Sequence, residues 1–291
     1  MSALPDVKEQ ALALPWIEQD HLMRALRDQL EADTQWRLGG KRIEDTYQKW
    51  ADLALEHLGR SPRKVMDFGA GIYHPLANVA KFNIIHGAQG IGVELDERFL
   101  PDRAAKCLAD TIFETFVKAD QQARERAMQF DLKALRRGQW SEQPAPGVSR
   151  FRGDVRHLDQ DGFDFIFSQS VMEHVDEFDS VIAALAERTA PGGVHAHVID
   201  MRDHRSYSRP DKHRWSFLCE EDPDGPFCNR LRFSEVIEVF ERHKFKVLLA
   251  RPQREKPPKD IRRHLVPQFS HLSYRDLERT GVRLVVRKKG K

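Results

Sequence analysis

Apolar residues recur at helical spacing over residues 7–60, and short apolar runs replace this pattern from residue 64 onward. Gly39-Gly40 separates two helical repeats in the first part. The first repeat has three readings: a lid, a dimer surface or ordinary packing. The second leads directly into a strand, so we expect it to pack beside the binding pocket. The apolar positions are Leu22, Met23, Leu26 and Leu30 in the first repeat and Tyr47, Trp50, Ala54 and Leu58 in the second.

Beyond residue 60 the apolar runs alternate with helical stretches, which predicts a parallel sheet with helices on both faces. The connection between the second and third runs is about twice as long as a helical crossover needs. We therefore expect an insertion over residues 121–148, either a substrate cap or a surface elaboration, within an α/β domain over 61–291 that follows a helical extension over 1–60. The expected strands are 64–68, 90–95, 149–153, 163–169, 193–200, 244–251 and 281–288.

Composition indicates a globular protein. Of 291 residues, 40% are hydrophobic and 32% charged, and 47 basic against 45 acidic residues give no electrostatic argument for a polyanionic partner. We expect neither a leader nor a membrane span, because no apolar run approaches the ~20 residues that a span requires. Cys107, Cys219 and Cys228 are too few and too widely spaced for a disulfide framework, so a cytoplasmic location is expected.

The first predicted strand ends in the most informative motif. Asp67 is followed by Phe-Gly-Ala-Gly, and Gly69 and Gly71 would let backbone N–H groups approach a ligand closely. Glu94 ends the second strand, where related folds place a carboxylate that binds a ribose. The third glycine of a dinucleotide-binding pattern is missing, since His74 stands there. An acidic residue beside the glycines instead suits a cofactor with a positive centre.

This segment resembles the first motif of class I S-adenosylmethionine-dependent methyltransferases, which reads hydrophobic-hydrophobic-Asp/Glu-x-Gly-x-Gly. The resemblance implies S-adenosylmethionine as cofactor and a Rossmann-like seven-stranded sheet of order 3-2-1-4-5-7-6, ending in a reversed hairpin. It also implies that Asp154 and the backbone of Val155 bind adenine, although Asp154 could instead cap the following turn. The cofactor-binding residues expected on this basis are Asp67, Gly69, Gly71, Glu94, Asp154, Val155 and Ser168.

Further along the chain the sequence is similar to methyltransferases of small metabolites. Glu173-His174 follows the fourth strand and Ala190-Pro191-Gly192-Gly193 precedes the fifth, as in many such enzymes. Residues 199–204 and 229–232 resemble a bacterial group that acts in glycan or secondary-metabolite biosynthesis. These features indicate the fold and cofactor, but they do not identify the acceptor.

The acceptor side is expected where the fourth and fifth strands end. A hydroxyl acceptor benefits from a base, so His204 and His174 are the candidate catalytic residues, with the alternative that both are structural. Asp200, Asp203 and His204 could bind a divalent ion, but the other ligands of such a site are not evident. Cys219, Cys228 and His213 could bind zinc, but they lack a short Cys-x-x-Cys pair, so we expect no metal. The candidate acceptor-binding residues are Tyr73, Arg202, Arg205, Tyr207 and Trp215, unless residues 200–217 form a solvated loop with buried aromatics.

The resulting prediction is methyl transfer to a hydroxyl, or in second place an amine, of a small polar acceptor such as a sugar or pathway metabolite. No nucleic acid or membrane is expected as a partner, and a homodimer is one option for assembly. The alternatives are a protein or nucleic-acid methyltransferase, a non-catalytic cofactor-binding subunit and, as the weakest, a nicotinamide dehydrogenase. Ser168-Gln169-Ser170-Val171 replaces the Asn/Asp-Pro-Pro-aromatic signature of enzymes that methylate nucleic-acid amino groups.

Overall fold

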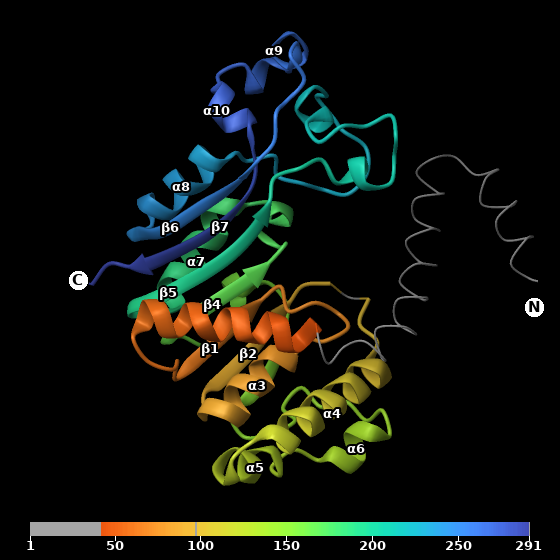
Figure 1. Ribbon diagram of the computed structural model, residues 1–291, viewed down its shortest axis with the longest axis vertical. Helices are drawn as coiled ribbons and strands as arrows, with labels where there is room; N and C mark the ends of the chain where they lie inside the picture. Colours follow the sequence, from red (N-terminus) through yellow and green to blue (C-terminus); the bar gives the residue numbers. More distant parts are fainter. Residues whose placement is uncertain (1–41, 97, 291) are drawn as a thin grey trace, which may run out of the picture.

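A computed structural model describes residues 42–96 and 98–290, and its centre is one seven-stranded sheet (Figure 1). The strand order is β3-β2-β1-β4-β5-β7-β6, which confirms the predicted fold. The first five strands run parallel, and β7 is antiparallel to both β5 and β6. The strands are β1 (Lys64–Phe68), β2 (Gln89–Glu94), β3 (Val148–Arg152), β4 (Phe163–Gln169), β5 (Thr189–Asp200), β6 (Phe245–Arg254) and β7 (Arg279–Lys288).

Helices cover both faces of the sheet. A helix over residues 42–58 lies on one face together with α3 and α4, and α7 and α8 lie on the other (Figure 1). The longer helices are α3 (Ala77–His86), α4 (Pro101–Lys118), α5 (Gln121–Ala127), α7 (Phe178–Arg188) and α8 (Phe233–Arg242), and the shorter ones are α6 (Leu132–Arg136), α9 (Ile261–His264) and α10 (Tyr274–Leu277). Within the described ranges, no helix is both long and apolar enough to cross a membrane.

Alternation along the strands explains the two-sided core. Consecutive side chains of a strand point to opposite faces, so Val65 packs with the helix over 42–58 while Met66 packs with α7 and α8. On the first face, the rings of Trp50 and Phe167 stack with centroids 5.3 Å apart. The nearly continuous burial of β1 and β4 is what a parallel sheet covered on both sides requires.

The second predicted N-terminal helix is present, and its side chains reach the carboxyl end of β4. Lys49 Nζ donates to Gln169 Oε1 at 3.2 Å, beside the edge where a ligand is expected. The first predicted helix and Gly39-Gly40 lie outside the described residues. The helix over 42–58 shares a core with the sheet, and the domain boundary at residue 60 stays a prediction.

The fifth strand begins earlier than predicted. We expected 193–200, but β5 starts at Thr189 and includes Pro191-Gly192-Gly193. Its register with β4 shifts between Phe163 and Phe165, so these residues form an irregularity inside the strand instead of a loop before it. Gly192 makes this possible with a φ of 75°, a conformation that favours glycine.

Residues 121–148 fold onto the outer layer of helices. Asp120 and Asp131 cap α5 and α6 by accepting hydrogen bonds from Ala123 N at 2.9 Å and Ala134 N at 3.0 Å. The buried side chains of this segment share a hydrophobic cluster with α3 and α4. Its role, whether a substrate cap or a surface elaboration, stays a prediction.

Candidate functional site

The glycine loop after β1 is shaped by close backbone packing. Gly69 has a φ of 72° and Gly71 a φ of 79°, and Gly69 N donates to Val93 O at 2.9 Å. A Cβ on Gly69 would lie 2.2 Å from a methyl group of Val171, whereas a Cβ on Gly71 would meet nothing within 4 Å. Gly69 is therefore required by packing, and Gly71 leaves open space beside the loop.

Glu94, at the tip of β2, holds this loop to the neighbouring strand. Its Oε2 accepts from Gly71 N at 2.7 Å, and its Oε1 accepts from Leu95 N and Asp96 N, both at 2.8 Å. A carboxylate offers about four acceptor positions, so one on Oε2 remains for a hydroxyl. The arrangement fits the ribose role expected from the sequence.

Asp67 is buried directly under the glycine loop. Only 6% of the residue is exposed, and its Oδ2 accepts from Asn78 Nδ2 at 3.2 Å. Burial raises the pKa of Asp67 to about 7; the Asn78 hydrogen bond offsets part of this rise, and the charge of Glu94 adds to it. Asn78 Oδ1 and His74 Nδ1 are also buried and lack hydrogen-bond partners. The unsatisfied Asn78 oxygen, on a side chain that contacts the buried Asp67 carboxyl group, fits a ligand that carries an ammonium group.

Asp154, Val155 and Ser168 differ in how they are placed. Asp154 caps the 3-10 helix η1 (Val155–His157) by accepting from Arg156 N at 2.8 Å, and its carboxylate also pairs with the Arg156 guanidinium. Ser168 is fully buried within the sheet, where its Oγ lies 2.8 Å from His197 Nδ1. The described contacts thus give Asp154 a local capping role and Ser168 a partner inside the core.

His174 and His204 meet at the carboxyl ends of β4 and β5. They belong to the 3-10 helices η2 (Met172–His174) and η3 (His204–Tyr207), and their ring centroids are 4.8 Å apart in an edge-to-face contact. His174 Nδ1 lies 2.6 Å from Phe227 O, and His204 Nε2 lies 3.7 Å from Asp200 Oδ2. The structure therefore brings the two candidate bases together.

Cys228 and Glu173 complete this cluster. One ligand atom each of His174, His204 and Cys228 lies within 4.8 Å of the others. Glu173 is 4% exposed, neither carboxylate oxygen has a hydrogen-bond partner, and burial raises its pKa to about 8. Sequence reasoning singled out neither residue for this site. The one signal for Glu173 was its place beside His174. The sequence grouped Cys228 with Cys219 and His213, and only the folded chain brings it to the two histidines of this site.

Burial lowers the pKa of His204, and the neighbouring imidazole of His174 lowers it further, while Asp200 partly opposes both effects. A lowered pKa keeps the ring neutral at neutral pH. A neutral imidazole has one nitrogen lone pair that can accept a proton. The pair therefore has the chemistry expected of a base.

The loop over 200–217 separates the predicted acceptor-binding residues into two groups. Arg202 pairs with Asp200 at 2.8 Å, the Tyr207 hydroxyl donates to the same carboxylate, and the Tyr207 side chain is exposed beside His204. Arg205 is buried and paired with Asp203, Glu220 and Asp224, at distances of 2.5 to 2.7 Å.

Trp215 is also buried and donates from Nε1 to Leu277 O at 2.6 Å. Tyr73 lies half-buried in the loop after β1. Arg205 and Trp215 thus hold the loop in place, whereas Arg202 and Tyr207 line its surface toward the histidines.

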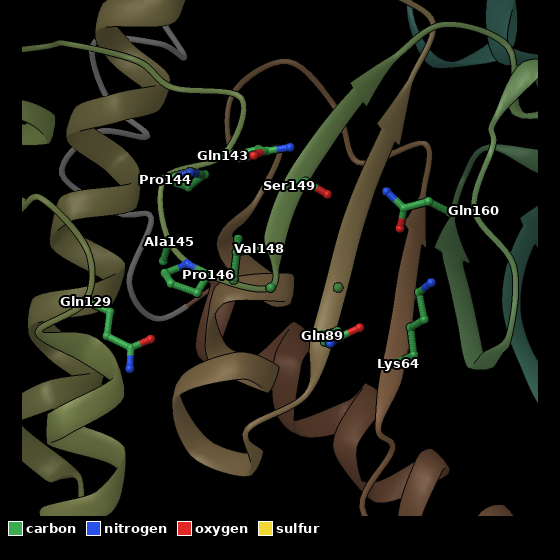
Figure 2. A pocket seen from close by; sticks show the side chains of 12 residues that line it. Lys64, Gln89, Gln129, Gln143, Pro144, Ala145, Pro146, Val148, Ser149 and Gln160 are labelled. Atoms are coloured by element: carbon green, nitrogen blue, oxygen red, sulfur yellow. The ribbon is translucent and has the colours of Figure 1, made fainter.

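A cavity of about 610 Å³ lies elsewhere, at the amino ends of β1, β2 and β3 (Figure 2). Its walls carry amides and prolines, including Gln89, Gln143 and Pro144, and Lys64 contributes its charged group. Ligands of open parallel sheets bind beyond the carboxyl ends of the strands, which is the opposite edge. The glycine loop and the histidines, and not this cavity, therefore form the candidate active site.

The strand order, the glycine loop after β1 and the carboxylate at the tip of β2 together define a Rossmann-like methyltransferase. The sequence matches the family model described as a methyltransferase domain over residues 41–251, so the chain belongs to this family. It is a methyltransferase, and S-adenosylmethionine is its cofactor. A search among curated proteins gives no match.

Solved structures that resemble the chain include three methyltransferases. One is the geranyl diphosphate C-methyltransferase of Streptomyces coelicolor A3(2), with 13% identity, 86% of this chain and 83% of that chain covered, and a TM-score of 0.47. Another is an S-adenosylmethionine-dependent methyltransferase of Mesorhizobium loti, with 14% identity, 78% of this chain and 91% of that chain covered, and a TM-score of 0.41. The third is the N-methyltransferase NodS of Bradyrhizobium japonicum WM9, with 12% identity, 84% of this chain and 86% of that chain covered, and a TM-score of 0.41. Likenesses this distant carry no argument about the acceptor.

Proposed function

We propose that the protein transfers the methyl group of S-adenosylmethionine to a hydroxyl, or in second place an amine, of a small polar acceptor such as a sugar or pathway metabolite. The observation that carries this proposal is the contact between His174 and His204, 4.8 Å apart between ring centroids, at the edge of the sheet that also bears the glycine loop. A cytoplasmic setting is part of the proposal, and the three free cysteines suit it.

On the donor side, Asp67, Gly69, Gly71 and Glu94 would bind S-adenosylmethionine, which supplies an electrophilic methyl group on a sulfonium. Glu94 would hold the ribose. Asp67 and the side-chain oxygen Oδ1 of Asn78 would accept hydrogen bonds from the ammonium group. Asp154 and the Val155 backbone remain proposed for adenine. Ser168 remains a proposal as well, and its bond to His197 suggests support from beneath the site.

On the acceptor side, His204 or His174 would remove the hydroxyl proton as the oxygen attacks the methyl carbon. General base catalysis of this kind contributes about 10²–10⁴-fold to a rate. Arg202, Tyr207 and Tyr73 are proposed to bind the acceptor directly. Arg205 and Trp215 are proposed to fix the loop that carries the histidine, because buried partners already occupy both side chains. Alignment of oxygen, carbon and sulfur then supplies the rest of the catalysis.

A panel of hydroxylated and amino acceptors, assayed with a methyl-labelled donor, tests the reaction. His204→Ala and His174→Ala should each lower turnover by about a hundredfold while the affinity for S-adenosylhomocysteine stays the same. His264→Ala is the control, because that histidine is exposed on α9 and should leave turnover unchanged. Full turnover in both site variants would contradict the base assignment. Transfer to protein or nucleic acid alone would contradict the small acceptor.

A further inference from the structure

His174, His204 and Cys228 form a cluster whose chemistry goes beyond a base. Two imidazoles and a thiol are a ligand set that zinc prefers. Their ligand atoms come from three separate segments, and all lie within 4.8 Å of one another. No spacing in the sequence predicts that these three residues meet. Along the chain, Cys228 lies nearer to Cys219 and His213 than to either histidine of the cluster.

The His174 ring is held as a metal-ligating histidine usually is. His174 uses Nδ1 to contact the carbonyl oxygen of Phe227 at 2.6 Å, which leaves the lone pair of a neutral ring on Nε2. A hydrogen bond from one ring nitrogen to a carbonyl group commonly fixes the ring while the other nitrogen binds a metal. His204 Nε2 is buried and has no hydrogen-bond partner.

A second observation comes from the charges around the cluster. Glu173 is almost fully buried, both of its oxygens lack hydrogen-bond partners, and it lines one small cavity with Asp200 and Cys228. Glu173 thus places a buried carboxyl group that has no hydrogen-bond partner beside the Cys228 side chain, close to where a bound cation would lie.

We propose that His174, His204 and Cys228 bind one divalent ion of the zinc class on the acceptor side of the active site. A tetrahedral zinc ion, with bonds of about 2.0–2.3 Å, holds its ligands roughly 3.5 Å apart. The side chains must therefore close by about 1 Å from their present separation, a distance that side-chain rotation covers. Three protein ligands leave a fourth position open, as in catalytic zinc sites.

This inference departs from the expectation of no metal, and it does not depend on the methyl acceptor. An acceptor oxygen in the open position would bind a Lewis acid, which lowers the pKa of a bound hydroxyl group. In that form the ion, and not an imidazole, would activate the acceptor. Metal binding would replace the imidazole as the activating group. It is measured without a methyl donor or acceptor, so failure of the metal proposal leaves methyl transfer with a histidine base in place, and failure of methyl transfer leaves metal binding in place.

The test is equilibrium dialysis of the metal-free full-length protein against Zn²⁺, followed by metal analysis. Co²⁺ serves as the second probe, because a bound thiolate gives a charge-transfer absorption. We expect one ion per chain and a thiolate band in the wild type. Cys228→Ser should abolish the band, and Cys228→Ser and His204→Ala should each weaken Zn²⁺ binding at least about tenfold.

Cys219→Ser is the matched control, since Cys219 is another part-buried thiol of the same region and lies outside the cluster. It should bind Zn²⁺ like the wild type. Retained affinity for S-adenosylhomocysteine in each variant would show that the fold and the donor site are intact. The metal proposal is overturned if the wild type binds no ion at a single site, or if Cys228→Ser binds as tightly as Cys219→Ser.

Discussion

The proposed donor and acceptor sides of the candidate active site are built in different ways. The donor side consists of backbone around two adjacent parallel strands, where Glu94 on β2 accepts from the amide of Gly71 after β1. The acceptor side consists of side chains from segments far apart in the sequence, as when His174 contacts Phe227. The comparison indicates that cofactor binding depends on local strand geometry, whereas acceptor binding depends on how the loops over 200–232 fold together.

The largest expected effect is on the donor side alone. Replacing Glu94 with Ala removes a carboxylate that orders three backbone amides, so affinity for S-adenosylhomocysteine should fall at least about a thousandfold. Asp67→Ala should have a similar effect. Calorimetric titration measures both, and Asp159→Ala, an exposed carboxylate before β4, is the control. Unchanged binding in both variants would remove the donor site from this edge.

A second prediction concerns pH. The raised pKa of Asp67, about 7, means that the folded ligand-free protein holds this proton more tightly than the unfolded chain. The stability that the protonated Asp67 side chain contributes is fully present below the pKa of Asp67 in the unfolded chain. It is lost as pH rises through the folded-state pKa of about 7. Asn does not titrate, so Asp67→Asn should gain stability relative to the wild type as pH rises.

The gain should reach at most roughly 4 kcal/mol, because each unit of pKa shift corresponds to about 1.4 kcal/mol. Urea unfolding without ligand at about pH 5 and about pH 8 should show roughly 2.5 kcal/mol of this gain, because the rest already arises below pH 5. Affinity for the cofactor should be lower in the variant at the higher pH. A stability difference that is the same at both pH values would show that burial of Asp67 is not the cause.

The two glycines separate packing from backbone conformation. Gly69→Ala should destabilise the protein by roughly 2–4 kcal/mol, because its Cβ would overlap Val171 and the left-handed backbone disfavours it. Gly71→Ala should destabilise the protein by about 1 kcal/mol, because only the left-handed backbone conformation disfavours alanine there. Thermal unfolding compares them, and adding Val171→Ala should restore part of the loss at Gly69 but none at Gly71. Equal losses for both single variants would contradict the packing argument.

The smallest effect should be confined to the acceptor side. Asn229 Nδ2 donates to Met172 O at 2.7 Å and Val175 O at 3.0 Å, and so joins the loop to the segment that carries His174. Asn229→Ala should lower kcat/KM for the acceptor by about tenfold and leave cofactor affinity unchanged. Asn229→Asp keeps the side-chain oxygen that accepts a hydrogen bond from Leu231 N but loses the two hydrogen bonds to carbonyl oxygens. It should therefore lower kcat/KM as much as Asn229→Ala does. A matching loss of cofactor affinity would show that the two sides are coupled.

Sequence reasoning reached the donor side more fully than the acceptor side, for a physical reason. Asp67, Gly69 and Glu94 end strands whose adjacency follows from the fold, so their residue types and order sufficed to bring them together. The Arg205 guanidinium shows the limit, because its partners Glu220 and Asp224 come from a different part of the loop. The sequence made Arg205 a candidate acceptor-binding residue, but only the folded structure shows that its charge is already neutralised.

The reach of β5 has a consequence for how such an enzyme diversifies. Its last pairing with β4 is at Val198, and β7 alone continues to pair with it through Ile199 and Asp200. Arg232, fully buried, donates to Met201 O at 2.5 Å and also to the carbonyl oxygen of Arg279, the first residue of β7. The loop over 200–232 is thus anchored to the C-terminal hairpin. The proposed donor residues Asp67, Gly71 and Glu94 all precede Val198, so substitutions in this unit of loop and hairpin would alter the surroundings of His204 and leave the donor residues in place.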